Sequence, residues 1–555
     1  MKRVLCLSVV LLSFCATLCA VNNPKPVVNQ PLVPASAAPG AAGFTLTVNG
    51  TGFVTGAVVK WNGNARTTTF ISSSSLQAAI LSTDVAHAGT ASVTVSNPTP
   101  HGGASNVVYF PVHGSTPSVA FAPEPNVAPL AGPIAVGDFT GDNKLDLVVG
   151  QTSPDGTTGS ILYYKGQGNG GFATPVTTTS SLPVQQLLVG DFNGDGKLDV
   201  MIGTKNGAFG PAEGIAFINV GSGNFTEKTA FGTGDFGGPL AIADLNGDGI
   251  LDVVFGSEVQ GAGTVYFYLG NGDGTFTLKS SQSMNNSVGF AAIGDFNGDG
   301  KLDVAVPEGP QMDVFLGNGD GTFQPFVPYT TTCGGTAAAA DLNGDGKLDL
   351  VLGNLCVLLG KGDGTFTVGT GNGSGAAPIA IGDFNGDGKL DVVGPGGQVY
   401  LGNGDGTFQN PTPTTFATNA SATIPFGDFN RDGQLDLAII GSSSVQIGLQ
   451  TSLRVTPGSL SFGSHKVGTT SAKQAVTLTD VGAKSVPITS IAISGTNAGD
   501  FSQQNNCGVG LQSGKSCTAN VVFKPTATGA RSATLTITYS GVDTPQTVAL
   551  SGIGT

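Results

Sequence analysis

The chain has 555 residues, more than a single hydrophobic core organises, so we expect three or four folded units. Its 87 glycines, 11% charged residues and 39% hydrophobic residues argue against disorder and favour an all-β protein with many tight turns. The formal net charge of −14 argues against a nucleic-acid partner, because a phosphate backbone attracts clustered Lys and Arg.

The N-terminal residues are typical of an export signal. Lys2 and Arg3 precede a mostly apolar run over 4–18, and small residues end at Ala20. The run is short for a bilayer span, no cysteine in it follows a small residue as lipid attachment would require, and no later apolar stretch is long enough to cross a membrane. We therefore expect 1–20 to be a signal peptide and the mature chain to be secreted or held at the cell surface, without a transmembrane segment.

Residues 31–114 contain short strand-like runs separated by turns, a pattern that predicts a β-sandwich. The lone Trp61 is expected in its core rather than on a ligand-stacking surface. The stretch GFTLTVNGTGFVTGAVVKWNG, which begins at Gly43, resembles the IPT/TIG immunoglobulin-like family. That resemblance implies an immunoglobulin-like domain but identifies no partner.

Self-similarity organises residues 117–450. Seven nine-residue segments share the pattern Asp-x-[Asn/Thr]-x-Asp-[Gly/Asn]-x-x-Asp, and we call them Asp loops 1 to 7. Their starts lie 42 to 53 residues apart, which leaves room for four short strands and their turns in each repeat. Alternating apolar runs flank every loop, so the sequence predicts a seven-bladed β-propeller. The loops begin at Asp138, Asp191, Asp244, Asp295, Asp341, Asp383 and Asp428.

A second landmark, the turn Gly-Asn-Gly-Asp-Gly-Thr-Phe and its looser variants, marks a fourth strand. It accompanies six of the seven repeats and is missing after the last. The segment around Phe121 resembles the missing strand, so we expect it to complete the last blade and close the ring. These turns lack the ninth-position carboxylate and are interpreted as plain turns. They end at Phe172, Phe225, Phe276, Phe323, Phe366 and Phe408.

Each Asp loop offers side-chain oxygens at positions one, three, five and nine, and a backbone carbonyl at position seven. Such an all-oxygen set suits a hard cation, and Ca²⁺ takes about six to eight oxygen ligands. Without a cation, three like charges would lie close together in every loop. An Asx-rich turn with no metal is the alternative for any single loop, but seven copies that keep the ninth Asp favour a metal site.

The expected calcium ligands number four side chains and one carbonyl in each loop. The side chains are Asp138, Thr140, Asp142, Asp146, Asp191, Asn193, Asp195, Asp199, Asp244, Asn246, Asp248, Asp252, Asp295, Asn297, Asp299, Asp303, Asp341, Asn343, Asp345, Asp349, Asp383, Asn385, Asp387, Asp391, Asp428, Asn430, Asp432 and Asp436. The carbonyls belong to Lys144, Lys197, Ile250, Lys301, Lys347, Lys389 and Gln434.

These repeats resemble the FG-GAP/VCBS family, whose best-known members are the propeller heads of integrin α subunits. The resemblance covers about residues 117–450 and rests on the Asp loops. It implies that the propeller is a recognition platform and that its calcium loops are structural. The ligand-contacting residues do not transfer from the family to this chain.

Residues 452–555 again show short strands and turns, which predict a second sandwich. Outside the signal, four cysteines remain, an even number that favours disulfides in an exported chain. Proximity suggests the pairs Cys333–Cys356 and Cys507–Cys517, whereas zinc would need closer spacing. This segment resembles the hydin-like and choice-of-anchor-D immunoglobulin-like domains.

No catalytic constellation stands out. There is no Gly-x-Ser-x-Gly elbow, the histidines lie outside the repeats, and Gly514-Lys515-Ser516 lacks the first glycine of a phosphate-binding loop. We therefore expect a non-enzymatic calcium-binding adhesion or recognition protein with an extracellular protein or glycan ligand. The alternative is a carbohydrate-active protein, either a propeller lectin or a polysaccharide-cleaving enzyme. Chelation should destabilise 117–450 and leave both sandwiches little changed.

Overall fold

The computed structural model of the chain describes most of the sequence. The described residues are 4–6, 19–87, 89–112, 119, 121–123, 127, 132–204, 213–232, 236–259, 262–331, 334–353, 355–369, 380–394, 397–411, 424–431, 434–441, 444–451, 453–480, 485–512, 515–539 and 545–555.

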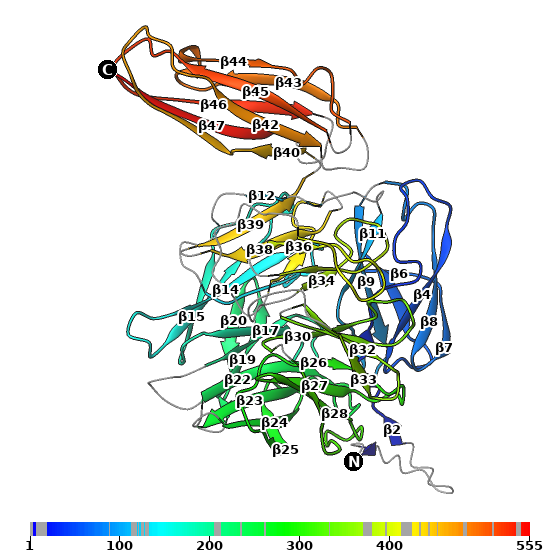
Figure 1. Ribbon diagram of the computed structural model, residues 1–555. Helices are drawn as coiled ribbons and strands as arrows, with labels where there is room; N and C mark the ends of the chain where they lie inside the picture. Colours follow the sequence, from blue (N-terminus) through cyan, green and yellow to red (C-terminus); the bar gives the residue numbers. More distant parts are fainter. Residues whose placement is uncertain are drawn as a thin grey trace, which may run out of the picture.

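The fold of the described residues is all-β, as the composition predicts (Figure 1). Strands are short and alternate buried with exposed residues in the sandwiches, whereas the second strand of a repeat is buried on both faces. Within the described part, no helix is long and apolar enough to cross a membrane. At the N-terminal end, β1 (Val4–Cys6) pairs antiparallel with β2 (Cys19–Val21).

The N-terminal unit is a two-sheet sandwich. Its core contains Trp61, which is 2% exposed and packs against Phe110 with ring centroids 5.1 Å apart, so the prediction of a core tryptophan is confirmed. One sheet holds β3 (Val27–Val28), β4 (Phe44–Thr51), β8 (Ser75–Ile80) and β7 (Thr68–Ser72). The other holds β10 (Gly103–Ala104), β9 (Gly89–Asn97), β5 (Val58–Trp61) and β6 (Asn64–Ala65), with β11 (Val108–Val112) paired to β9.

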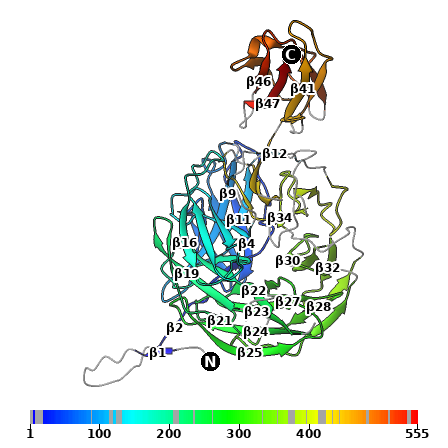
Figure 2. The same ribbon diagram turned by 90° about the vertical axis from the view of Figure 1, so that its left-hand side faces the viewer.

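The repeats form small antiparallel sheets that follow one another around a ring (Figure 2). Each pair of neighbouring sheets packs its apolar side chains into a core between them. A middle strand therefore has a core on each side and is buried on both faces. Sheet 1 contains β13 (Ile134–Gly137), β14 (Asp146–Thr152), β15 (Gly159–Tyr164) and β16 (Val176–Ser180). Sheet 2 contains β17 (Gln186–Gly190), β18 (Asp199–Gly203), β19 (Glu213–Gly221), β20 (Asn224–Glu227) and β21 (Phe231–Gly232).

The next three sheets repeat this order. Sheet 3 contains β22 (Phe236–Ala243), β23 (Asp252–Val259), β24 (Ala262–Gly270) and β25 (Phe276–Ser283). Sheet 4 contains β26 (Ala292–Gly294), β27 (Asp303–Glu308), β28 (Gln311–Phe315) and β29 (Val327–Thr330). Sheet 5 contains β30 (Ala337–Ala340), β31 (Asp349–Leu352), β32 (Cys356–Gly360) and β33 (Phe366–Val368).

The last two sheets differ from this pattern. Sheet 6 contains β34 (Ala380–Gly382), β35 (Asp391–Val393) and β36 (Val399–Tyr400), followed by a turn bridge between Gly402 and Phe408; the next residues, 412–423, lie outside the described part. Sheet 7 contains β37 (Phe426–Gly427), β38 (Asp436–Ile440), β39 (Val445–Gln450) and β12 (Phe121–Pro123). Phe121 pairs with Gln450, so the segment before the first repeat completes the last sheet, as the sequence predicts.

The C-terminal unit is a second sandwich that extends from the ring (Figure 1). One sheet holds β40 (Leu453–Thr456), β42 (Gln474–Asp480), β45 (Ser516–Phe523) and β44 (Phe501–Asn505), and a 3₁₀ turn (Ala498–Asp500) precedes β44. The other holds β41 (Ser459–His465), β47 (Gln546–Gly554), β46 (Gly529–Tyr539) and β43 (Ile488–Ser494), with β41 parallel to β47.

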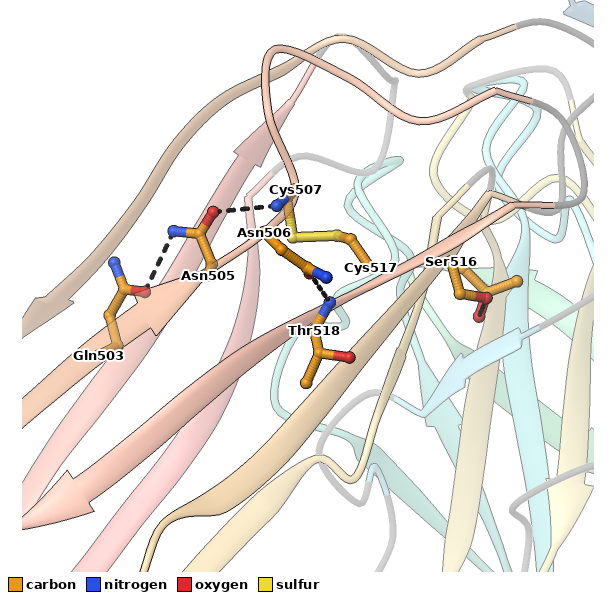
Figure 3. Close-up of a disulfide and its surroundings, with 8 residues drawn as sticks. Gln503, Asn505, Asn506, Cys507, Ser516, Cys517 and Thr518 are labelled. Carbon is orange, nitrogen blue, oxygen red and sulfur yellow. Dashed lines mark hydrogen bonds between the residues drawn. A yellow bond between two sulfur atoms is a disulfide. The ribbon is translucent and has the colours of Figure 1, made fainter.

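The Cys507–Cys517 disulfide is formed, with a Cα–Cα distance of 4.9 Å (Figure 3). Beside it, the N–H of Thr518 donates to Asn506 Oδ1 at 2.7 Å, which closes the hairpin end between β44 and β45. Cys333 lies outside the described residues, so the second predicted pairing stays a prediction.

The N-terminal sandwich packs on the ring. The rings of Tyr109 and Phe426 pack against each other in a tilted arrangement with centroids 5.6 Å apart, and the N–H of Asp341 donates to the Gln30 carbonyl at 2.9 Å. The expectation that chelation leaves this sandwich little changed did not take these contacts into account. The sequence could not reveal this contact, because nothing in either segment marks the other as its packing partner.

Candidate metal centre

Every Asp loop joins the first strand of its sheet to the second, and the ninth-position Asp is the first residue of that second strand. A tight turn is needed to bring the chain back, and position six supplies it with a positive φ. Gly196 has φ +84° and Gly346 has φ +83°, a region that glycine adopts without strain. Asn143, which replaces this glycine in Asp loop 1, has φ 59°, as the sequence predicts for an asparagine there.

The first-position Asp folds the loop around itself. In Asp loop 2, Asp191 Oδ1 accepts the N–H groups of Gly194 at 2.7 Å and Asp195 at 3.1 Å, and its Oδ2 accepts that of Gly196 at 3.2 Å. The bonds from positions five and six recur in Asp loops 1 and 3 to 6, for example around Asp383. This carboxylate therefore sets the loop conformation through backbone donors.

The ninth-position Asp holds three strands together. Asp199 is fully buried, its Oδ2 accepts the N–H of Phe192 at 2.9 Å, and its Oδ1 accepts that of Asn219, on the third strand, at 2.8 Å. Asp436 repeats this arrangement with Phe429 and Gln450 in sheet 7. The sequence marked these residues as metal ligands but did not indicate that each also ties the loop to the third strand.

In Asp loop 2, positions three, five and seven lie at the tip, where Asp195 and Lys197 are exposed. Asn193 Oδ1 accepts the N–H of Asp195 at 3.0 Å, and Asp195 Oδ1 accepts the N–H of Lys197 at 2.9 Å. The Lys197 ammonium also lies 3.0 Å from Asp195 Oδ2. The lysine at position seven, predicted only as a carbonyl donor, thus also neutralises part of the charge of the fifth-position Asp. Lys301 and Lys347 do the same in Asp loops 4 and 5.

The Gly-Asn-Gly-Asp-Gly-Thr-Phe segments are turns closed by their own side chains. Asp273 Oδ1 accepts the N–H of Thr275 at 2.9 Å and its hydroxyl at 2.6 Å. The same pair of bonds links Asp405 to Thr407. Each of these turns is closed by its own Asp and Thr side chains, and the interpretation of the segments as turns without a metal stays a prediction.

Burial and the other carboxylates of the loop raise the pKa of the ninth-position Asp. Burial raises the pKa of Asp199 to about 6, and the charges of Asp191 and Asp195 raise it as well. Burial and the neighbouring Asp295 and Asp299 raise the pKa of Asp303 to about 7. In the ninth-position Asp of Asp loops 3 and 6, burial and like charges raise the pKa well above its usual value. In each case burial is the largest cause, and the neighbouring carboxylates add to it.

The donor chemistry fits a calcium ion. A divalent cation would relieve the like-charge repulsion, and a carboxylate oxygen that accepts one N–H retains a further lone pair for a metal. Within the described residues, however, no three His, Cys, Asp or Glu side chains lie close enough together to hold an ion as they stand. Asp432 lies outside the described residues.

Comparison with known families agrees with this geometry. The FG-GAP-like repeat family matches residues 125–202, 244–306, 295–352 and 395–439, and the IPT/TIG domain family matches 30–111. The last segment, 450–555, matches domain 4 of Cep192. The hydin-like or choice-of-anchor-D assignment of that segment therefore stays a prediction.

Among curated proteins, integrin alpha pat-2 of Caenorhabditis briggsae is 30% identical over 213 residues, which is 31% of this chain and 17% of that protein. Integrin alpha-4 of Xenopus laevis is 33% identical over 15% of this chain and 10% of its own length. The chain thus spans less than a fifth of these relatives.

Solved structures include more distant neighbours. A lectin of Agrocybe aegerita that recognises terminal N-acetylglucosamine matches with a TM-score of 0.37 and 20% identity, over 64% of this chain and 96% of the lectin. The WD40 domain of Toxoplasma gondii coronin matches with a TM-score of 0.39 and 10% identity, over 61% of this chain and 87% of that domain. The sheets, their Asp loops and the matching families together identify this chain as an FG-GAP-repeat β-propeller protein with an N-terminal IPT/TIG domain.

Proposed function

We propose that this protein is a secreted or cell-surface recognition protein whose propeller holds about one Ca²⁺ per Asp loop and binds an extracellular protein or glycan. The observation that carries the proposal is the repeated Asp loop, which gathers several carboxylates at one edge of every sheet. The integrin α relatives support a recognition role, and the apolar start of the chain over 4–18 supports export.

A bound calcium ion would supply the positive charge that these loops lack. The side chains at positions one, three, five and nine and the carbonyl at position seven are the residues that would hold it. Asp303 and its equivalents already fix the loop to the third strand, so an ion held there would stiffen the first three strands of a sheet together. The ion in this proposal has a structural role.

The free face of the ring is the expected ligand site. In each sheet the Asp loop joins strands one and two, and the Gly-Asn-Gly-Asp-Gly-Thr-Phe turn joins strands three and four. Successive turns of an antiparallel sheet alternate between its two ends, so the first and third turns lie at the same end. Both kinds of turn therefore lie on one face, which we call the Asp-loop face. The chain enters the ring at Phe121 and leaves it at Gln450, both beside Asp436 on this face. The opposite face carries neither junction and is left for a ligand.

A binding survey tests the proposal. The full-length protein is applied to arrays of glycans and of extracellular matrix proteins, in millimolar Ca²⁺ and after treatment with EDTA. We expect binding in calcium that falls at least about tenfold on chelation, because loosened sheets no longer present the opposite face rigidly. Binding that is unchanged after verified removal of calcium contradicts the proposal. Release of new reducing ends from a bound glycan would instead favour the carbohydrate-active alternative.

A matched pair of variants separates ion loss from charge loss. The triple variant Asp195→Asn, Asp299→Asn and Asp345→Asn removes three fifth-position carboxylates from Asp loops. The control triple variant Asp273→Asn, Asp320→Asn and Asp405→Asn removes the same charge from the turns. We expect weaker binding in the first variant and wild-type binding in the second. Equal loss in both would show that calcium in the loops is not the cause.

A further inference from the structure

The N-terminal sandwich lies over the Asp-loop face of the ring, in contact with loops from both halves of it. The backbone N–H of Lys25 donates to Asp244 Oδ2 at 2.7 Å, and its ammonium donates to the Asp191 carbonyl at 3.2 Å and lies 3.5 Å from Asp191 Oδ2. Lys25 thereby bridges the first-position residues of Asp loops 2 and 3. Its side chain is only 9% exposed, so the contact is buried between the two units.

Further contacts reach loops on the other side of the ring. Gln30 accepts the N–H of Asp341, the first residue of Asp loop 5, at 2.9 Å. Tyr109 belongs to the core shared by sheets 6 and 7 and lies against Gly427, which directly precedes Asp loop 7. Burial raises the pKa of Tyr109, and the charge of the nearby Asp428 raises it as well.

Asp loop 3 is covered more completely than its neighbours. Asp248, at its fifth position, is only 8% exposed, whereas Asp195 and Asp299, at the same position in Asp loops 2 and 4, are exposed. A Cβ built on Gly249 would lie 2.5 Å from the Asn23 carbonyl oxygen and 2.7 Å from the Gly102 nitrogen. The sandwich therefore touches the backbone of this loop at its tightest point.

Asp loop 6 is the second covered site. Asp383 is 7% exposed and Asn385 is 3% exposed, although the fifth-position Asp387 remains exposed. A Cβ on Gly388 would lie 3.7 Å from Ala35 Cβ, in the sandwich. Two of the loops thus have predicted ligands withdrawn from water by a unit that lies outside the repeats.

We infer that the N-terminal sandwich is a cap whose seating on the ring is coupled to the ions held in the Asp loops beneath it, Asp loops 3 and 6 above all. This inference rests on the proposed calcium binding. An ion fixes the loop conformation that the sandwich contacts, so ion binding and seating favour each other by linkage. Loss of the ion leaves carboxylates that repel one another directly beneath the cap.

Trp61 offers a selective readout. It is the only tryptophan of the chain and is buried in the core of the cap, so its fluorescence reports unfolding of that unit alone. In the full-length protein, we expect the midpoint of the Trp61 thermal transition to fall by on the order of 5 °C or more when EDTA replaces millimolar Ca²⁺. Calorimetry of the same samples follows the ring.

Gly249→Ala and Gly346→Ala form a matched pair. Both replace the glycine at position six of a loop at nearly the same φ, +86° and +83°, so both introduce similar backbone strain. A Cβ on Gly346 meets nothing within 4 Å, whereas one on Gly249 meets the cap. In calcium, we expect Gly249→Ala to lower the Trp61 midpoint by several degrees more than Gly346→Ala does. On addition of EDTA, the Trp61 midpoint of Gly249→Ala should fall less than that of the wild type.

Lys25→Met is a second variant, for the case that Gly249→Ala does not fold. Its control is Lys473→Met, which removes an exposed lysine of the C-terminal sandwich. We expect only Lys25→Met to lower the Trp61 midpoint. The inference is overturned if calcium binds and raises the calorimetric transition of the ring while the Trp61 midpoint stays fixed. A protein that binds no calcium, with neither transition moving, would defeat the proposed function itself.

Discussion

Asp303 has two separable roles at the residue scale. Its carboxylate is fully buried and accepts the N–H of Phe296 at 2.8 Å and that of Gly317 at 2.8 Å, and it is also an expected calcium ligand. The first role needs no metal, because both partners are backbone donors of this chain. An unsatisfied buried donor costs about 1–3 kcal/mol.

Asp303→Asn should therefore destabilise the ring even when calcium is absent. The amide can accept only one of the two N–H groups, so we expect the free energy of unfolding to fall by about 1–3 kcal/mol in EDTA. Denaturant unfolding followed by circular dichroism measures this loss. Asp299→Asn, at the exposed fifth position, is the control and should change it little. Equal stability of Asp303→Asn and the wild type in EDTA would show that the buried bonds contribute nothing.

A buried acid pair predicts a pH dependence. Glu308 and Asp313 are both fully buried; Glu308 Oε1 accepts the N–H groups of Asn285 and Asn286, and Asp313 Oδ1 accepts from the Gln311 amide. Burial raises the pKa of Asp313 well above its usual range, and the adjacent Glu308 raises it as well. The folded protein thus keeps a proton that the unfolded chain, with a pKa of about 3.9, releases.

Stability should therefore decline as the pH rises from about 4 towards neutrality, since the folded state binds more protons over that range. Asp313→Asn removes this group, and we expect it to flatten the decline by on the order of 1–2 kcal/mol. The measurement is urea unfolding between pH 5 and pH 8 in saturating calcium, which holds the Asp loops constant. Parallel profiles for the variant and the wild type would disprove a proton on this pair.

Much of the residue-scale site could be predicted from the sequence. The oxygen-bearing residues and the glycine of each loop recur at fixed spacing, so their clustering follows from the repeat itself. The hydrogen-bonding role of Asp199 could not be predicted, because its bond to Asn219 depends on the register of a third strand. The proximity of Glu308 to Asp313 could not be predicted either, because it arises from the pairing of β27 with β28.

At the element scale, the Cys507–Cys517 disulfide restrains a hairpin in the C-terminal sandwich (Figure 3). The cross-link closes a loop with a sequence separation of 10 residues, and closing a loop of that size stabilises by roughly 2–3 kcal/mol. We expect the double variant Cys507→Ala and Cys517→Ala to lower the calorimetric transition of that sandwich. The Trp61 transition should stay unchanged, and a shift of it would mean that the two sandwiches are coupled.

The elements themselves follow from local patterns. Alternating apolar residues and Gly-rich turns predicted strands throughout, and the missing fourth strand correctly placed Phe121 in the last sheet. In sheet 6 the turn forms a bridge from Gly402 to Phe408, as the same turns do in sheets 1 and 4, and residues 412–423, which follow it, lie outside the described residues.

At the scale of the whole molecule, the ring and the N-terminal sandwich share an interface that no local pattern encodes. Lys25 has no sequence context that marks it as a bridge between two loops nearly 170 and 220 residues away. Packing between distant segments depends on the shapes of both finished units. For this reason the repeats could be predicted from the sequence, whereas the packing of the cap on the ring could not.

Calcium stoichiometry tests the central claim most directly. Equilibrium dialysis of the full-length protein at millimolar free calcium should give about one ion per Asp loop. The triple variant Asp195→Asn, Asp299→Asn and Asp345→Asn should bind about three fewer ions, because each substitution removes a charged ligand from one loop. Less than one bound ion per chain in the wild type would contradict the account.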